Sequence, residues 1–180
     1  MLLRFINEFC TTLEYVVKFD DDMAVNLYQL NEFLKAFTSF PPTKINPQRA
    51  IIGKISPRLS VIRNKKNKWY LTKEEYSGNK YPVYILGGFY IIAAPLLPDL
   101  FEATKHSLFL KFEDIYMTGR LAEIAGNVSH YDIGGYLRMY KKVENQKDFL
   151  NLSVFATGVE NPKHLADLWK KLINIHYKKS

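Results

Sequence analysis

The chain has 180 residues, of which 47% are hydrophobic and 24% are charged. This length suits a single domain, 1–180, with a substantial core, and this composition excludes extensive disorder. The formal net charge of +7 indicates an acidic partner, whether nucleic acid, phosphates or sulfated glycans. No zinc-finger or RNA-binding motif accompanies the basic run 58–68, so we expect no nucleic acid among the partners. The single cysteine, Cys10, excludes an internal disulfide.

Hydrophobic periodicity predicts alternating helices and strands along the chain, which is typical of an α/β fold. Apolar residues at helical spacing predict helices over 2–9, 27–37, 95–105, 117–125 and 162–173. Short runs rich in β-branched and aromatic residues predict strands over 15–19, 50–53, 109–112 and 152–156. The polar, basic segment 58–78 predicts a long excursion over the surface.

The sequence contains no clear targeting signal. No apolar segment reaches the length needed to cross a bilayer, and the first four residues do not begin a signal peptide. Asn127-Val128-Ser129 and Asn151-Leu152-Ser153 match the acceptor pattern for N-glycosylation, which is weak support for the secretory pathway.

Three consecutive carboxylates, Asp20-Asp21-Asp22, follow the strand predicted over 15–19. Side chains alternate along a strand, so Asp20 and Asp22 are expected on one side and Asp21 on the other. Adjacent anions repel, and a hard divalent cation that prefers oxygen ligands is a natural partner for them. The alternative is an acidic loop before the next helix, with Asn26 or an aspartate as the N-cap.

Two glycines, Gly87-Gly88, lie between apolar runs in the segment 81–92. They favour a close approach of the backbone to a ligand, where a side chain would obstruct it. The alternative is a tight turn or a bulge between two buried strands.

A second acidic pair, Glu113-Asp114, is expected at the first turn of the helix that Gly126 ends. Acids are favoured at helix N-termini for capping and dipole reasons alone. The same placement keeps a carboxylate ionised, as a general base near neutral pH requires.

These motifs occur in the order found in one enzyme family. They are K-x-DDD-x-x-x-N over 18–26, K-W-Y over 68–70, Y-P-x-Y-x-x-G-G over 81–88, E-D-x-Y over 113–116 and a proline-started helix with Trp169 seven residues on. With them the chain resembles the C-terminal part of a family 31 glycosyltransferase, the β-1,3-galactosyltransferase and β-1,3-N-acetylglucosaminyltransferase group.

The resemblance implies a partial GT-A glycosyltransferase fold, a mixed sheet flanked by helices, with the N-terminal nucleotide-binding half missing. It implies a hexosyltransferase that moves galactose or N-acetylglucosamine from a UDP-sugar to a glycan acceptor, with inversion and a β-1,3 linkage, in protein glycosylation. The implied location is the lumenal side of the Golgi membrane, reached through an anchor absent from this chain. The alternative is a catalytically silent truncated homologue that binds a glycan or a protein partner.

The resemblance also assigns roles to residues. It implies Mn²⁺, or another divalent cation, held by Asp22 directly, with Asp20 orienting the ribose or a metal-bound water. Asp114 is the expected base towards the acceptor hydroxyl, with Glu113 as supporting acid or runner-up. The remaining implied site residues are Asp21, Gly87 and Gly88 for the donor, and Trp69 and Tyr84 on the acceptor side.

The sequence departs from the family pattern in three places. Many members have a metal-binding histidine where this chain has residues 155–161, so Glu160 or water would have to replace it. His130 and His164 do not match that position. Ala93 or Ala94 replaces a serine that often follows the glycine-rich strand. Gly119 stands one place further from the acidic pair than in some members.

Overall fold

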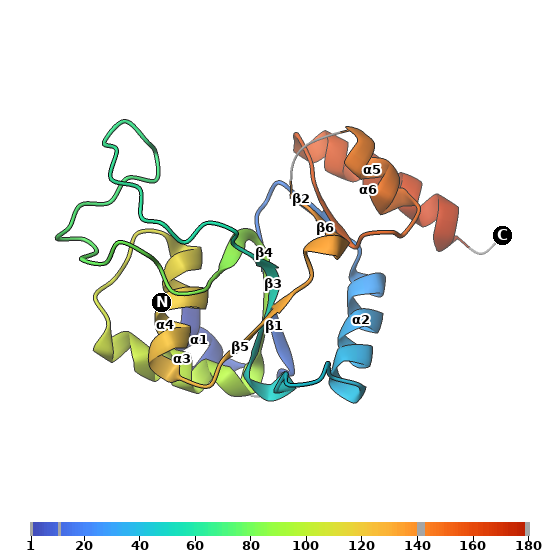
Figure 1. Cartoon of the computed structure of the whole chain (residues 1–180). Coiled ribbons are helices and arrows are strands. Elements are labelled where there is room, and N and C mark those ends of the chain that lie inside the picture. Colours follow the sequence, from blue (N-terminus) through green and yellow to red (C-terminus); the bar gives the residue numbers. More distant parts are fainter. Residues whose placement is uncertain (1, 11, 140–142, 179–180) are drawn as a thin grey trace.

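The computed structural model describes residues 2–10, 12–139 and 143–178 (Figure 1). Its α-helices are α1 (Leu2–Phe9), α2 (Leu27–Ser39), α3 (Leu97–Ala103), α4 (Leu121–Ala125), α5 (Val143–Leu150) and α6 (Pro162–His176). Its strands are β1 (Tyr15–Phe19), β2 (Met23–Val25), β3 (Ala50–Ile55), β4 (Ile85–Ala93), β5 (Ser129–Asp132), β6 (Leu137–Arg138) and β7 (Ala156–Gly158). A π-helical segment, Ile115–Arg120, leads directly into α4.

The strands form two mixed sheets, which confirms the predicted mixed α/β class. The larger sheet has the order β1-β4-β3-β5, and only the β3–β5 pair in it is parallel. The smaller sheet has the order β2-β7-β6, with β6 and β7 parallel. A mixed sheet flanked by helices is consistent with a partial GT-A-like domain.

Helices cover both faces of the larger sheet (Figure 1). On one face α1, α3 and α4 pack against a core that includes Tyr90 and Ile92 of β4. On the other face α2 and the smaller sheet pack against a core that includes Phe89 and Ile91. The two cores take alternate residues of the same strand because side chains alternate across a sheet. A sheet buried on both faces explains why β4 is apolar nearly throughout.

The sequence predicted the helices better than the strands, and it missed α5, β2, β5 and β6. The predicted helices correspond to α1, α2, α3, the π-helical segment with α4, and α6, and Gly126 ends α4 with a φ of 69° as expected. The predicted strands over 15–19 and 50–53 are β1 and β3. Between the end of β3 and the start of β4, the chain makes a long excursion, 56–84, that contains two isolated bridges and no longer strand or helix.

Two predicted strands were wrong. Residues 109–112 form no strand, because Phe109 is 78% exposed and the segment pairs with no neighbour among the described strands. The strand predicted over 152–156 begins only at Ala156, because α5 continues to Leu150 and Leu152 turns the chain with a φ of 63°. Hydrophobic composition alone does not supply a strand with a partner.

Gly87 and Gly88 lie inside one continuous strand, β4, and therefore form no tight turn between two strands; an irregularity of the β-bulge kind lies opposite them. In the pairing of β3 with β4, Gly53 faces Tyr90 but Ile55 faces Ile85, so β4 has extra residues between these two pairs. Such an irregularity bends the strand and redirects side chains near it.

Within the described part of the chain, no helix combines the length and the apolar character needed to cross a bilayer.

Candidate active site

A cleft of about 470 Å³ opens where β1 ends, β4 bulges and the π-helical segment begins. The excursion closes part of one side with Trp69. The cleft is lined by Lys18, Asp20, Asp22, Met23, Lys54, Trp69, Leu86, Gly87, Gly88, Lys111, Phe112, Glu113, Asp114 and Met139. Segments far apart in the sequence thus bring both predicted acidic groups to one place.

The acidic triplet forms a turn between β1 and β2. The Met23 N–H donates to the Asp20 carbonyl (3.1 Å), and the Asp20 N–H donates to the Gly88 carbonyl (3.1 Å). Asp20 and Asp22 line the cleft, whereas Asp21 is exposed and lies outside its lining. The cap of α2 is Asn26, whose Oδ1 accepts the Gln29 N–H at 3.3 Å. The aspartates are therefore not needed as helix caps.

Lys18 lies between the two acidic groups, and no role was predicted for it. Its Nζ donates to Asp20 Oδ1 (2.5 Å) and to the Gly87 carbonyl (2.6 Å), and it lies 3.8 Å from Glu113 Oε2. The side chain is only 27% exposed, so these contacts are partly shielded from water. A signal was available, because Lys18 and Asp20 are two residues apart at the end of a strand.

Asp114 is held by backbone amides on both carboxylate oxygens. Oδ2 accepts the Gly87 N–H at 3.0 Å, and Oδ1 accepts the Ile115 N–H at 2.8 Å. Burial raises the pKa of the Asp114 carboxyl above its ordinary value, while these amide bonds and Lys18 oppose the rise. A helix terminus alone favours the ionised carboxylate, but burial has a larger effect of opposite sign on the pKa of Asp114.

Glu113 is half exposed beside Asp114. Its Oε1 accepts the Tyr90 hydroxyl proton, and burial, opposed by that bond and by Lys18, raises the pKa of the Glu113 carboxyl. Burial and the neighbouring Glu113 raise the pKa of Tyr90, so the phenol stays protonated and donates. The cleft therefore has two carboxylates whose proton affinity is increased, a common property of groups that exchange protons in reactions.

The two glycines remove side chains where the backbone meets the acids. A Cβ on Gly87 would lie 3.2 Å from Asp114 Cβ, closer than ordinary contact. A Cβ on Gly88 would lie 2.5 Å from Met139 Cε and would face Asp20. Glycine at these positions thus keeps the cleft open between its two acidic groups.

The two predicted acceptor-side aromatics lie in different environments. Trp69 lines the cleft, is 49% exposed and meets Phe112 edge to face with ring centroids 5.3 Å apart. Tyr84 is buried, does not line the cleft, and donates its hydroxyl proton to the Arg58 carbonyl at 3.4 Å.

In the described part of the chain, no three His, Cys, Asp or Glu side chains converge as a complete protein metal site. Asp20 and Asp22 nevertheless offer hard oxygen ligands on one side of the cleft, which fits a Mg²⁺- or Mn²⁺-like ion that takes its other ligands from phosphates and water. Residues 155–161, where a histidine was sought, lie beside the triplet, since the Val159 N–H donates to the Asp22 carbonyl (2.7 Å). Neither Glu160 nor His164 lines the cleft.

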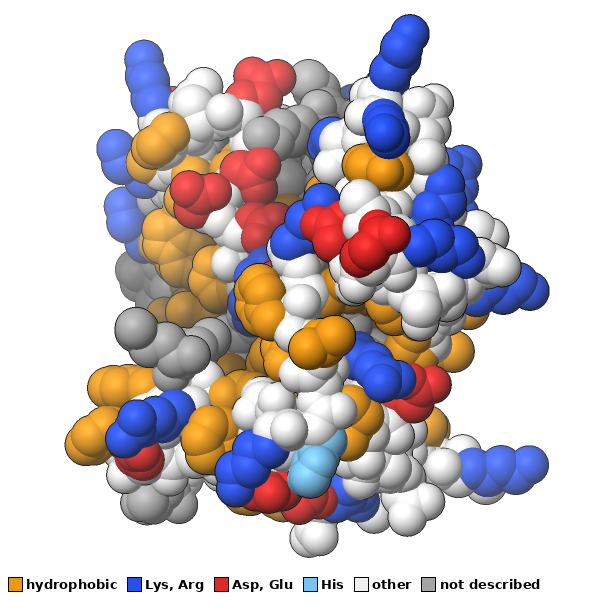
Figure 2. Space-filling view, turned by 90° about the vertical axis from the view of Figure 1, so that its left-hand side faces the viewer, with side chains coloured by type: hydrophobic (Ala, Val, Ile, Leu, Met, Phe, Trp, Pro, Cys, Tyr) orange, Lys and Arg blue, Asp and Glu red, His pale blue; other side chains and the backbone are white. Residues whose placement is uncertain are grey.

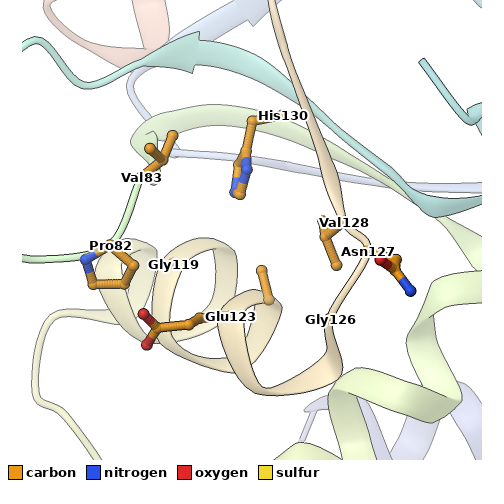
Figure 3. Close-up of a pocket in the computed structure, with 9 residues that line it drawn as sticks. Pro82, Val83, Gly119, Glu123, Gly126, Asn127, Val128 and His130 are labelled. Carbon is orange, nitrogen blue, oxygen red and sulfur yellow. The ribbon is translucent and has the colours of Figure 1, made fainter. Parts of the chain in front are cut away.

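A smaller pocket of about 220 Å³ lies behind the π-helical segment, between Pro82, Val83 and His130 (Figure 3). His130 Nε2 lies 2.6 Å from the Thr118 carbonyl, and burial lowers the pKa of the imidazole. A neutral ring that donates to a carbonyl supports the helix. Thr118 in turn donates to the Asp114 carbonyl (2.6 Å) and accepts the Ile85 N–H (2.9 Å). These hydrogen bonds of His130 and Thr118 therefore stabilise the π-helical segment that follows Asp114.

The α/β fold thus brings acids from a strand end and from a helix start together with lysines in one cleft. A family model described as Galactosyltransferase matches residues 1–133. The chain is 31% identical over 124 residues to mouse beta-1,3-galactosyltransferase 5, covering 69% of this chain and 38% of that protein. It is 26% identical over 173 residues to mouse N-acetyllactosaminide beta-1,3-N-acetylglucosaminyltransferase 2, covering 96% and 42%. The chain therefore belongs to the galactosyltransferase family.

The family prediction is confirmed, and with it the general class of glycosyltransferase by resemblance. The chain spans about two fifths of the length of these two relatives. The family model ends at residue 133, just after β5 completes the larger sheet, so the smaller sheet's β6 and β7 and the helices α5 and α6 lie beyond it.

Proposed function

We propose that this chain contributes the reaction centre of a UDP-sugar-dependent hexosyltransferase that adds galactose or N-acetylglucosamine to a glycan in a β-1,3 linkage. The observation that carries the proposal is the meeting of Asp20 and Asp22 with Glu113 and Asp114 in one cleft. Family membership supports the sugar chemistry. The proposed location is the lumenal side of the Golgi membrane, through an anchor outside this chain.

On the donor side, Asp22 would ligate Mn²⁺ or another divalent cation, and Asp20 would orient the ribose or a water on the metal. When bound, such an ion neutralises charge on the diphosphate leaving group. Lys18 holds Asp20 in place and keeps a positive charge close to the metal ligands and the acids. Gly87 and Gly88 leave room for the sugar, and Asp21 stays a donor-side prediction as the exposed member of the triplet.

On the acceptor side, Asp114 would take the proton of the acceptor hydroxyl. The acceptor oxygen then bonds to the anomeric carbon, and the sugar–phosphate bond breaks, with its electron pair leaving on UDP. Attack opposite the leaving group inverts the configuration. The raised pKa of Asp114 supports this role because a more basic carboxylate takes a proton more readily. Glu113 would assist or replace it, with Trp69 as the acceptor wall; Tyr84 packs beside Tyr81 outside the cleft lining and has no part in it.

A second candidate is a catalytically silent homologue that binds a glycan or a protein partner. The observation that favours it is that no described histidine lies beside Asp22 at the cleft, where the resemblance expects a third metal ligand. In such a homologue Trp69 would still contact a ligand, but a UDP-sugar would not bind through a metal ion.

Calorimetric titration of UDP with and without Mn²⁺ tests the donor site. We expect Mn²⁺-dependent binding that Asp22→Ala weakens by a factor on the order of 30 or more, because truncating one partner of a close charge contact costs ~2–5 kcal/mol. Asp167→Ala on α6 removes the same charge from an exposed position and is the control. Equal, metal-independent heats for all three proteins would reject the donor site in this chain and favour the silent homologue.

A further inference from the structure

The excursion carries most of the positive charge that the sequence leaves unexplained. Residues 57–80 contain seven Lys or Arg and two acidic residues, a net +5 of the chain's +7. Lys65, Lys66 and Lys68 are exposed at its tip, and within the described ranges no carboxylate forms an ion pair with any of them. Figure 2 shows Lys and Arg side chains projecting from the upper part of this face, with acidic side chains between them.

The excursion is a built platform. The Arg63 guanidinium donates to the carbonyls of Leu71 (2.9 Å), Thr72 (2.6 Å), Tyr76 (2.6 Å) and Gly78 (2.6 Å), which ties both arms together. At the tip, the side chain of Asn67 accepts the Trp69 N–H at 2.9 Å. Trp69 and its neighbouring lysines are thereby presented in a defined position, which lowers the entropy lost on binding.

Ammonium groups lie beside the aromatic wall of the cleft. Lys68 Nζ is 4.6 Å from the centroid of the Trp69 ring, and Lys111 Nζ is 5.6 Å from that of Phe112. Lys111 also pairs with Glu75 at 3.0 Å, so Lys68 is the cation more available to a ligand. A sugar that packs on this wall meets positive charge at its edge.

We propose that the acceptor glycan is anionic, carrying sulfate or carboxylate groups that Lys65, Lys66 and Lys68 bind while Trp69 contacts the sugar ring. This inference rests on the proposed function and names the acceptor class of the same site. A neutral glycan would offer no opposite charge to Lys65 and Lys66, which are exposed near Trp69 in the sequence, or to Lys68 beside the Trp69 ring. Family membership favours a glycan over nucleic acid as the anionic partner.

The test is calorimetry of the 180-residue chain with matched hexasaccharides. The probes are keratan sulfate, the same backbone after desulfation, and desulfated chondroitin, which keeps only carboxylates. We expect at least one anionic probe to bind about tenfold more tightly than desulfated keratan, the size that a few exposed ion pairs give. Changing Lys65, Lys66 and Lys68 together to Gln should remove that advantage. Changing Lys163, Lys170 and Lys171 on α6 to Gln makes the same charge change elsewhere and should leave affinity within about twofold.

The relative affinity of the two anionic probes identifies sulfate or carboxylate as the source of charge. The inference is overturned if neither binds more tightly than desulfated keratan, if both triple variants lose affinity equally, or if single-stranded DNA of equal charge competes as well as the glycan. Mn²⁺-dependent UDP binding of the same preparations separates the two proposals. UDP binding that depends on Asp22 without a preference for anionic glycans overturns only this inference, and the reverse result overturns only the donor site.

Discussion

The two walls of the cleft are built by different means. The wall that carries the acids is part of the larger sheet and the segment packed on it, so Asp114 is fixed by the Gly87 amide of β4 and Asp20 by the Gly88 carbonyl. The wall that carries Trp69 belongs to an excursion without regular secondary structure, held together by the partly buried Arg63 guanidinium. Groups held in a fixed geometry thus lie on the sheet, whereas Trp69, the proposed acceptor wall, lies on an irregular excursion, the kind of element that varies most readily.

The largest expected effect follows substitution of Arg63, which should destabilise the wall that carries Trp69 and leave the wall that carries the acids folded. Arg63→Ala leaves four carbonyls without their charged donor, and each hydrogen bond to a charged group contributes ~1.5–3 kcal/mol. Because the excursion lies outside the sheet, we expect fast hydrogen exchange confined to residues 57–80, with β3 and β4 still protected.

Hydrogen exchange read by mass spectrometry measures this effect, with Arg58→Ala as an exposed control in the same excursion. UDP binding should persist in Arg63→Ala. Loss of protection throughout β4 would contradict the claim that the walls are stabilised independently.

Substitution of Thr118 should destabilise the wall that carries the acids, because Thr118 contacts that wall from the protein interior. Thr118 is fully buried and links Asp114 to Ile85, so Thr118→Val leaves buried polar groups unpaired. We expect the free energy of unfolding to fall by about 1–3 kcal/mol, measured by urea denaturation. Thr43→Val, at an exposed position, should change it by less than about 0.5 kcal/mol. Equal effects of the two variants would contradict the supporting role of Thr118.

The sequence was sufficient where a local pattern decides the outcome. The β1 strand, the cap at Asn26 and the proline-started helix α6 each follow from a few adjacent residues, and all are present. The glycine bulge was one of two open alternatives, because a continuous strand depends on β3 as its partner.

What the sequence left out depends on contacts across the fold. Lys18 became important only when the fold placed the Gly87 carbonyl and Glu113 beside it, 69 and 95 residues further along the chain. The strand predicted over 109–112 failed for the same reason, because a strand needs an edge to pair with. Tyr84 illustrates the reverse case, since its motif suggested the cleft but its ring packs into the core beside Tyr81.

Removing the charge of Lys18 should change the pKa values of the two carboxyl groups, Glu113 and Asp114, on the wall that carries the acids. Lys18 opposes the rise that burial causes in the pKa of Glu113 and of Asp114, so Lys18→Met should raise both pKa values further. Carbon-13 NMR titration of the carboxyl groups measures this, and Lys18→Arg, which keeps the charge, should restore most of the wild-type behaviour. Unchanged titration in Lys18→Met would show that the 3.8 Å separation from Glu113 is too well screened to matter.

The smallest expected effect is the dependence of stability on pH. Burial raises the pKa of Glu113 in the folded state, so the folded state binds its proton more tightly than the unfolded state does. The contribution of Glu113 is therefore fully present below its unfolded pKa, about 4.3, and is lost as pH rises through the folded pKa. Glu113→Gln keeps an acceptor for Tyr90 and removes the titration, so the variant should gain stability relative to wild type between those two pKa values. Urea denaturation at steps from pH 4 to pH 7 measures the difference, and because the side chain is 50% exposed we expect solvent to reduce it well below the effect of Thr118→Val. If Glu113→Gln instead loses stability relative to wild type as the pH rises, Lys18 outweighs burial at this carboxylate. The wall that carries the acids would then be stabilised by the contact of Lys18 with Glu113, and partial burial of Glu113 would matter less.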